Sequence, residues 1–311
     1  MPKPPMRHKT RLAGGVAVIL VCALSGCCMI PMTTRSDYGR DADGPWSNAE
    51  LVFRERLDRG YTIVLPGIWG DQAVDYGIVM GLRDGDVESA VELHDWTPKT
   101  LCLVYNLRAI DQNRAEARRI AAKIVAYQDR YPCRPVHLVG YSGGAGEAVL
   151  TLEALPADRK VTDAILLAPT LASDYDLRPA MSRTTCGIRN FYSPLDVPIL
   201  MVLSTAFGTT EGRHTPAAGA IGFQTPTSAS PEERLEYENR LPQQSYEPGM
   251  VMEGHCGGHF GWANRAFIAR YVAPLLAASV TPAPPSATAS DDEEERNRFA
   301  LLGGTPTSGA Y

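Results

Sequence analysis

The chain has 311 residues, of which 44% are hydrophobic and 21% are charged, and its formal net charge is −5. This is an ordinary globular composition, and the length is sufficient to bury one large core. The basic residues are not gathered into a stripe, so the sequence excludes the usual electrostatic footprint of a nucleic-acid-binding protein. One large α/β domain with distinct ends fits these values best.

The first 26 residues are typical of a secretory signal. Four basic residues precede an uncharged stretch from Leu12 to Leu24, which is too short to span a bilayer. It is followed by Ser25-Gly26-Cys27, and together with Leu24 this resembles the lipobox of bacterial lipoproteins. The resemblance implies that Cys27 carries a diacylglyceryl anchor and becomes the mature N-terminus; an uncleaved anchor or a plain secretory signal is the alternative. Loss of residues 1–26 would change the net charge from −5 to −9, because it removes four basic residues and no acidic one.

The rest of the chain divides by composition into a tether, a domain and a tail. We expect a tether over residues 27–48, a folded domain over 49–280 and a disordered acidic tail over 281–311, because both ends are too poor in apolar residues to fold. The domain is expected outside the cytoplasm, on the periplasmic or cell-surface side of a membrane. Disulfides form in that environment, and Cys102 with Cys133 is a weak candidate pair, with free thiols as the alternative.

In chain order, the domain alternates strands with helices. Helices are expected over residues 49–59, 72–82, 111–131 (with Asp111 as N-cap), 144–155 and 264–273. Strands are expected over residues 61–65, 87–96, 136–139, 164–167 and 191–193, whereas 101–105 fits either a strand or an apolar loop. This alternation predicts a mostly parallel sheet with helices on both faces.

The pentapeptide Gly140-Tyr141-Ser142-Gly143-Gly144 lies between an apolar strand and a helix of small residues. In that context GxSxG predicts a nucleophile elbow, in which a serine is exposed at a sharp turn and glycines avoid collisions with the strand and the helix. The following helix directs its N-terminal amides and the positive end of its dipole toward Ser142, which favours developing negative charge there. A glycine-rich turn with an incidental serine is the alternative.

A second candidate loop is Pro66-Gly67-Ile68, directly after the strand at 61–65. Ligands gather at the carboxyl ends of parallel strands, so catalytic groups are expected just after each strand. Here we expect the amides of Ile68 and Gly143 to form an oxyanion hole. A plain tight turn is the alternative for Pro66-Gly67.

Three aspartates compete for the role of the acid. Asp196 follows the strand at 191–193, whereas Asp174 and Asp176 follow the preceding strand. The commoner placement is after the later strand, so we prefer Asp196. A helix cap is an adequate explanation of Asp174.

Two histidines lie in the glycine-rich loop at 254–261, just before the last helix. We prefer His259 to His255 as the general base because it is closer to that helix. A zinc site at His255, Cys256 and His259 is disfavoured because the glycines make this segment a loop and no further ligand cluster accompanies it. The sequence therefore predicts neither a metal nor a cofactor.

Ser142, Asp196 and His259 occur in the order serine, acid, histidine, which belongs to the α/β-hydrolase fold. Residues 61–276 resemble α/β-hydrolases of the lipase and esterase kind, and with the lipobox the chain is similar to exported bacterial lipoproteins of the hydrolase type. One departure is that the oxyanion loop begins with Pro66 instead of the His-Gly of many lipases.

The resemblance implies a serine hydrolase that cleaves a small-molecule or lipid ester through an acyl-enzyme. Residues 206–253 are expected to form a cap or lid, with a surface excursion as the alternative. Two further interpretations stay open: acyl transfer by the same residues, and a catalytically inactive membrane-anchored binding lipoprotein on the same fold.

Overall fold

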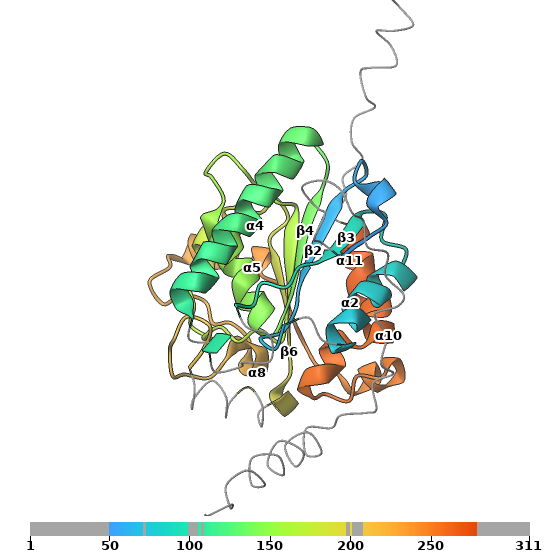
Figure 1. Cartoon of the computed structure of the whole chain (residues 1–311). Coiled ribbons are helices and arrows are strands. Elements are labelled where there is room, and N and C mark those ends of the chain that lie inside the picture. The colour runs from blue at the N-terminus through green and yellow to red at the C-terminus, as the bar shows by residue number, and fades with distance from the viewer. Residues whose placement is uncertain are drawn as a thin grey trace, which may run out of the picture. The chain divides into compact units, whose positions relative to one another are not determined.

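The structure is a computed structural model, and it describes residues 50–70, 73–98, 105–106, 109–196, 200 and 208–278 (Figure 1). Cys27, the expected signal, the tether and the tail lie outside the described residues. Within the described ranges, no helix combines the length and the apolar character needed to cross a membrane.

Seven strands form one sheet in the order β1-β3-β2-β4-β5-β6-β7. All neighbouring strands are parallel except β1, which pairs antiparallel with β3. The strands β2, β4 and β5 are buried along their whole length, which explains their nearly continuous apolar sequences. The strand bounds are β1 (Glu50–Val52), β2 (Tyr61–Leu65), β3 (Ala90–Leu93), β4 (Val136–Tyr141), β5 (Asp163–Leu167), β6 (Ile188–Tyr192) and β7 (Gln243–Ser245).

Helices cover both faces of the sheet, as the sequence predicts. On one face lie α4 (Ile110–Arg130) and α5 (Gly143–Ala154); on the other lie α2 (Ala73–Asp84), α10 (Arg265–Phe267) and α11 (Ala273–Ala278), with a π-helical turn at Ile268–Val272 between the last two (Figure 1). Strand side chains alternate between these layers, so Ile63, Leu138 and Leu166 join the core under α4 and α5, whereas Val64, Val139 and Ile165 join the core under α2.

The segment 208–253 completes the domain. It supplies α8 (Ala218–Ile221), α9 (Pro231–Arg240) and the edge strand β7, while α6 (Arg178–Met181) comes earlier in the chain. Its first part is hydrogen-bonded to the loop after β5, through Ser173 N to Pro216 O at 3.1 Å and Ala218 N to Leu171 O at 2.7 Å. A lid function within 206–253 stays a prediction.

Three expectations are wrong. The helix over 49–59 is replaced by β1 and a 3-10 helix at Arg54–Arg56, because Glu50–Val52 pairs with the outer edge of β3 and Phe53 takes a left-handed backbone conformation with φ 60°. Asp111 does not cap α4, which begins at Ile110 without a side-chain cap. Cys133 is a free, exposed thiol and does not pair with Cys102.

Another cysteine does form a disulfide. Cys256, in the loop that carries His259, is disulfide-bonded. The other two described cysteines, Cys133 and Cys186, are free, so the partner of Cys256 lies outside the described residues.

Candidate active site

Ser142 lies at the sharp turn between β4 and α5, with φ 55° and ψ −116°. A non-glycine residue in this region is strained, which is the backbone signature of a nucleophile elbow. Gly140 and Gly144 permit the turn: a Cβ on Gly140 would lie 2.5 Å from the Cα of Ala145, and one on Gly144 would collide with the carbonyl of Leu65. The elbow geometry predicted from the pentapeptide is therefore present.

His259 contacts both other members of the predicted triad. Its Nε2 lies 2.9 Å from Ser142 Oγ, and its Nδ1 lies 2.6 Å from Asp196 Oδ2. Because a carboxylate can only accept, Nδ1 carries the proton and donates it to Asp196, and Nε2 accepts from the serine hydroxyl. The imidazole is 6% exposed and Ser142 is 5% exposed, so this chain of hydrogen bonds is largely shielded from water.

Asp196 ends the short 3-10 helix Pro194–Asp196, directly after β6. Its side chain is fully buried. Burial raises the pKa of this carboxyl, and the charge and hydrogen bond of His259 oppose that rise. Its second oxygen, Oδ1, has no hydrogen-bond partner among the described residues, so the contact with His259 is what stabilises the carboxylate there.

The rival aspartates lie elsewhere. Asp174 forms an exposed pair with Arg213, at 2.6 Å between Oδ1 and Nη1, and Asp176 is paired with Arg178 at 2.7 Å. Both carboxyls have a lowered pKa, first of all because these arginines donate hydrogen bonds to them. The structure brings only Asp196, of the three, to a histidine.

The rival histidine, His255, belongs to the core. It is fully buried against Trp262, with ring centroids 4.0 Å apart, and its Nδ1 accepts from the amide of Gly257 at 3.0 Å. Burial lowers its pKa to about 3, so the ring stays neutral. Its glycine-rich sequence context gives no sign of this structural role. In the described part of the chain, no group of three or more His, Cys, Asp or Glu side chains is placed to hold a metal ion.

The two residues that are expected to supply the oxyanion donors are neighbours in the structure. A Cβ built on Gly143 would overlap the Cγ2 atom of Ile68, so the two residues are in direct contact. The amides of Ile68 and Gly143 have no hydrogen-bond partner among the described residues. Two unpaired N–H groups beside a serine can bind a negatively charged oxygen.

Two threonines behind the elbow are a feature that the sequence analysis missed. The amide of Thr170 donates to the carbonyl of Ser142 at 3.3 Å, and the hydroxyls of Thr170 and Thr210 lie 2.6 Å apart. Thr210 also crowds Gly146 of α5, where a Cβ would lie 2.6 Å from the threonine hydroxyl. No sequence pattern marks either residue, because the pair joins loops 40 positions apart.

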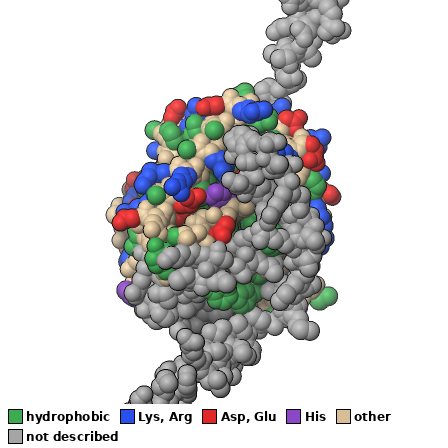
Figure 2. Space-filling view, in the orientation of Figure 1, with side chains coloured by type: hydrophobic (Ala, Val, Ile, Leu, Met, Phe, Trp, Pro, Cys, Tyr) green, Lys and Arg blue, Asp and Glu red, His purple; other side chains and the backbone are tan. Residues whose placement is uncertain are grey.

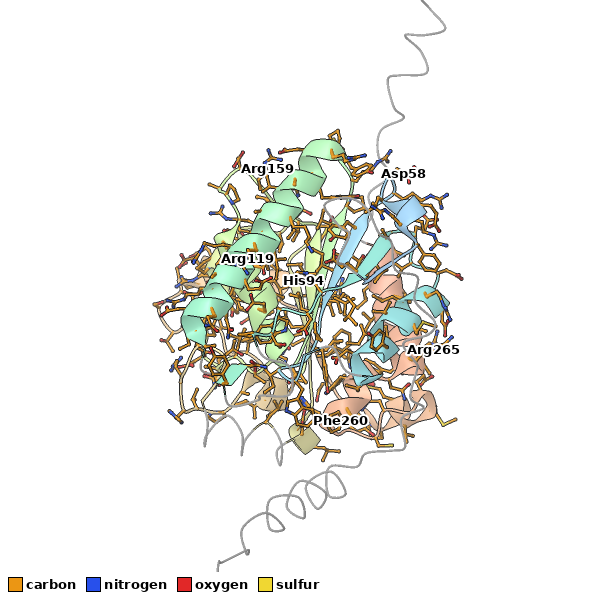
Figure 3. The ribbon with its side chains drawn as sticks, in the orientation of Figure 1. Asp58, His94, Arg119, Arg159, Phe260 and Arg265 are labelled. Carbon is orange, nitrogen blue, oxygen red and sulfur yellow. The ribbon has the colours of Figure 1, made fainter. Side chains whose placement is uncertain are left out.

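A separate buried charge cluster joins β3 to α4, and Figure 3 shows His94 beside the helix that carries Arg119. His94 contacts Glu92 through Nδ1 and Glu116 through Nε2, both at 3.0 Å, and Lys123 lies 2.5 Å from Glu92. Burial lowers the pKa of His94, but the hydrogen bonds to Glu116 and Glu92 outweigh it and the net shift is upward. Each charge has an opposite partner, so the cluster forms an ionic link between the strand and the helix.

On the surface, side chains of both charges are mixed over the face seen in Figure 2.

The sheet is mostly parallel, and a strained serine follows β4, an aspartate follows β6 and a histidine precedes the last helices. This arrangement is the α/β-hydrolase fold. No protein-family model matches the chain, and its sequence has no significant match among curated proteins.

Three of the solved structures that are similar to this chain are named as a lipase, a phosphotriesterase and a carboxyl esterase. Lipase B of Aspergillus fumigatus is 13% identical with a TM-score of 0.49, over 89% of this chain but only 63% of the lipase, which is therefore considerably longer. A dienelactone hydrolase-like promiscuous phosphotriesterase from metagenomic libraries is 14% identical with a TM-score of 0.41, over 71% of this chain and 86% of that enzyme. Carboxyl esterase 2 of Tuber melanosporum is 12% identical with a TM-score of 0.42, over 85% of this chain and 95% of that enzyme.

Proposed function

We propose that the protein is a serine hydrolase that cleaves carboxylic esters through a Ser142–His259–Asp196 triad. The observation that carries this proposal is the unbroken chain of short contacts from Ser142 Oγ to Nε2 of His259 and from Nδ1 to Asp196. Such a series of hydrogen bonds from serine to histidine to aspartate activates a hydroxyl for attack on an acyl carbon.

In the first step, His259 Nε2 takes the proton of Ser142 as Oγ bonds to the ester carbonyl carbon. The carbonyl oxygen becomes an oxyanion and accepts hydrogen bonds from the amides of Ile68 and Gly143. The imidazolium is stabilised by the Asp196 carboxylate. It then gives its proton to the departing alcohol oxygen as the carbon–oxygen bond breaks, which leaves an ester between Ser142 and the acyl group.

In the second step, water attacks this acyl-enzyme. His259 takes a proton from the water, the same two amides bind the second oxyanion, and the proton returns to Ser142 as the acid is released. If an alcohol took the place of water, the same residues would perform acyl transfer. The substrate class expected from this chemistry is a small-molecule or lipid ester.

The nucleophile can be tested directly with a fluorophosphonate probe. We expect the wild-type protein to be labelled covalently and Ser142→Ala to lose the label together with hydrolysis of p-nitrophenyl esters, because Oγ is the atom that forms the bond. The exposed Ser228 provides the control Ser228→Ala, which should keep both. A folded wild-type protein that takes up no label would favour an inactive binding lipoprotein instead.

We also propose that the mature protein is an exported lipoprotein held on a membrane through Cys27. The Leu24-Ser25-Gly26-Cys27 sequence at the end of a short apolar stretch supports this. The disulfide at Cys256 supports export, since disulfides persist in oxidising compartments.

A further inference from the structure

The loop that carries Ile68 is a tight turn held by several hydrogen bonds of its backbone groups. The amide of Gly70 donates to the carbonyl of Gly67 at 3.0 Å, which closes the turn. The carbonyl of Pro66 accepts from Trp96 Nε1 at 2.8 Å, and the amide of Gly67 donates to Asp75 Oδ1 at 3.1 Å. Proline has no N–H of its own. Ile68 has two backbone groups of its own, a carbonyl and an amide.

The carbonyl of Ile68 is held by Asn106. The side-chain Nδ2 of Asn106 donates to it at 2.8 Å, and this asparagine is fully buried. The peptide plane before Ile68 is fixed by the Gly67–Gly70 hydrogen bond, and the plane after it is fixed by Asn106. With both planes fixed, the direction of the Ile68 amide is fixed as well.

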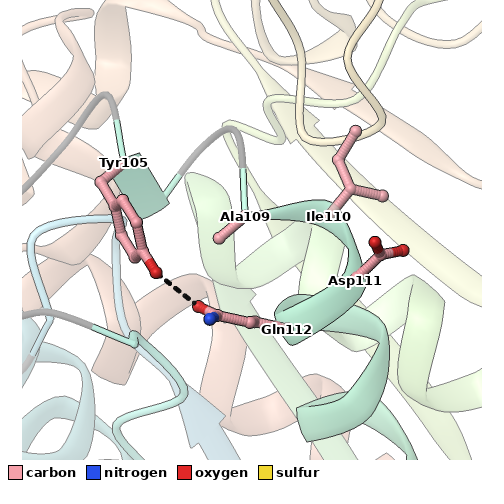
Figure 4. A pocket seen from close by; sticks show the side chains of 5 residues that line it. All are labelled: Tyr105, Ala109, Ile110, Asp111 and Gln112. Atoms are coloured by element: carbon pink, nitrogen blue, oxygen red, sulfur yellow. Dashed lines mark hydrogen bonds between the residues drawn. The ribbon is translucent and has the colours of Figure 1, made fainter.

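Asn106 is in turn held by the first turns of α4. Its carbonyl accepts from Nδ2 of Asn113, a fully buried residue of that helix, at 3.0 Å. The neighbouring Tyr105 donates its hydroxyl to Gln112 Oε1 at 3.0 Å, across a hollow of about 600 Å³ at the start of the helix (Figure 4). The dipeptide 105–106 therefore connects the turn to a 21-residue helix.

We infer that Asn106 is a positioning residue for the oxyanion hole, because its hydrogen bond to the carbonyl of Ile68 fixes the plane after this residue and so holds Ile68 where its amide lies beside Gly143. This inference rests on the proposed function. Asn106 acts on the reaction through Ile68, by keeping one donor aimed where negative charge develops. Loss of one oxyanion donor costs about 100- to 1,000-fold in kcat, so a donor that is merely misdirected should cost less.

The test compares Asn106→Ala with the matched control Asn190→Ala. Asn190 is also a fully buried asparagine with a side-chain hydrogen bond, to Gln243 at 2.9 Å, but it lies at the β6–β7 edge. We expect Asn106→Ala to lower kcat for p-nitrophenyl butyrate about 10- to 100-fold with KM within about threefold, and Asn190→Ala to keep kcat within about twofold. A trifluoromethyl ketone, whose adduct with Ser142 places an oxyanion in the hole, should bind Asn106→Ala more weakly by the same factor as the loss of kcat/KM.

A second variant, Asn106→Asp, separates loss of positioning from loss of the fold, because aspartate has nearly the same side-chain volume as asparagine. A neutral carboxyl can still donate to the Ile68 carbonyl, whereas a carboxylate repels it, so the ratio of variant to wild-type kcat should fall as the pH rises. An unchanged ketone affinity, a kcat within twofold of wild type, or an equal loss in Asn190→Ala would overturn the inference. A wild-type protein that neither hydrolyses esters nor reacts with a fluorophosphonate would instead overturn the proposed function, and the positioning role with it.

Discussion

At the scale of single residues, the candidate site depends on one buried carboxylate. Asp196 has no exposure to solvent, and burial raises the pKa of its carboxyl, whereas the charge and hydrogen bond of His259 favour the charged form. A buried acid of this kind is useful when it fixes the tautomer of a histidine. The hydrogen bond of 2.6 Å to Nδ1 is consistent with that role.

This role can be measured by substitution. We expect Asp196→Asn to lower kcat about 10³- to 10⁴-fold, because the amide can donate to Nδ1 and so favours the wrong tautomer of His259. The control is Asp174→Asn, which removes an exposed pair with Arg213 and should leave kcat near the wild-type value. The opposite ranking of the two variants would move the acid to the loop after β5.

The three residues of the proposed triad could be predicted from the sequence, but the proposed positioning residue could not. Ser142 has flanking glycines, and Asp196 and His259 follow strand and loop patterns, so each carries a local mark. Asn106 has none: its partner, Ile68, is 38 positions away and contributes only a backbone carbonyl. Such a contact leaves no periodicity or spacing in the sequence.

At the scale of elements, the helix α5 carries a buried carboxyl whose charged form its surroundings disfavour. Glu147 of α5 is fully buried, and both its oxygens lack hydrogen-bond partners among the described residues. Burial, and secondarily the charge of Glu116 on α4, raises its pKa to about 9. The carboxyl is therefore neutral in the folded protein at pH 7, but ionised in the unfolded chain.

This difference links stability to pH. Between pH 4.5 and 9 the carboxyl of Glu147 holds a proton in the folded state that it has lost in the unfolded state, so the contribution of Glu147 to the free energy of unfolding falls as the pH rises, by at most about 1.4 kcal/mol per pH unit. We expect Glu147→Gln to flatten this fall between pH 5 and 8 in urea titrations. The exposed Glu236 of α9 supplies the control Glu236→Gln, which should retain the wild-type slope. Parallel curves for wild type and Glu147→Gln would show that Glu147 is charged in the fold.

The long buried elements were predicted well, and the short ones near the sheet edges were not. The strands β2, β4 and β5 and the helix α4 have apolar patterns that burial imposes, whereas β7 has no fully buried residue and only three positions. The start of helix α9 is marked in the sequence, because Ser230 and Glu233 have the spacing of a capping box and Pro231 occupies the first helical position. The sequence predicts a helix at 50–52 wrongly because the pairing partner of this segment, β3, lies 39 to 43 positions further along the chain, and only this tertiary contact selects the strand.

At the scale of the whole molecule, the proposed anchor makes location testable without any reference to activity. We expect wild-type protein, expressed in a Gram-negative host, to be recovered with membranes and to carry lipid on Cys27, and Cys27→Ser to be soluble or retained as the unprocessed precursor. The adjacent Cys28 supplies the control Cys28→Ser, which should remain membrane-bound. An unchanged membrane fraction and an unchanged lipid mass for Cys27→Ser would eliminate the anchor.

The separation of the triad along the chain has a consequence for biogenesis. Ser142 and His259 are 117 positions apart, and His259 and Asp196 are 63 apart, so local structure alone does not hold the three residues together. Contacts of such long range form late, after most of the loop-closure entropy has been lost. If the protein is exported as proposed, the serine of a chain that is still crossing the membrane is therefore unreactive. Covalent labelling of Ser142 would then count only the molecules that have finished folding after export.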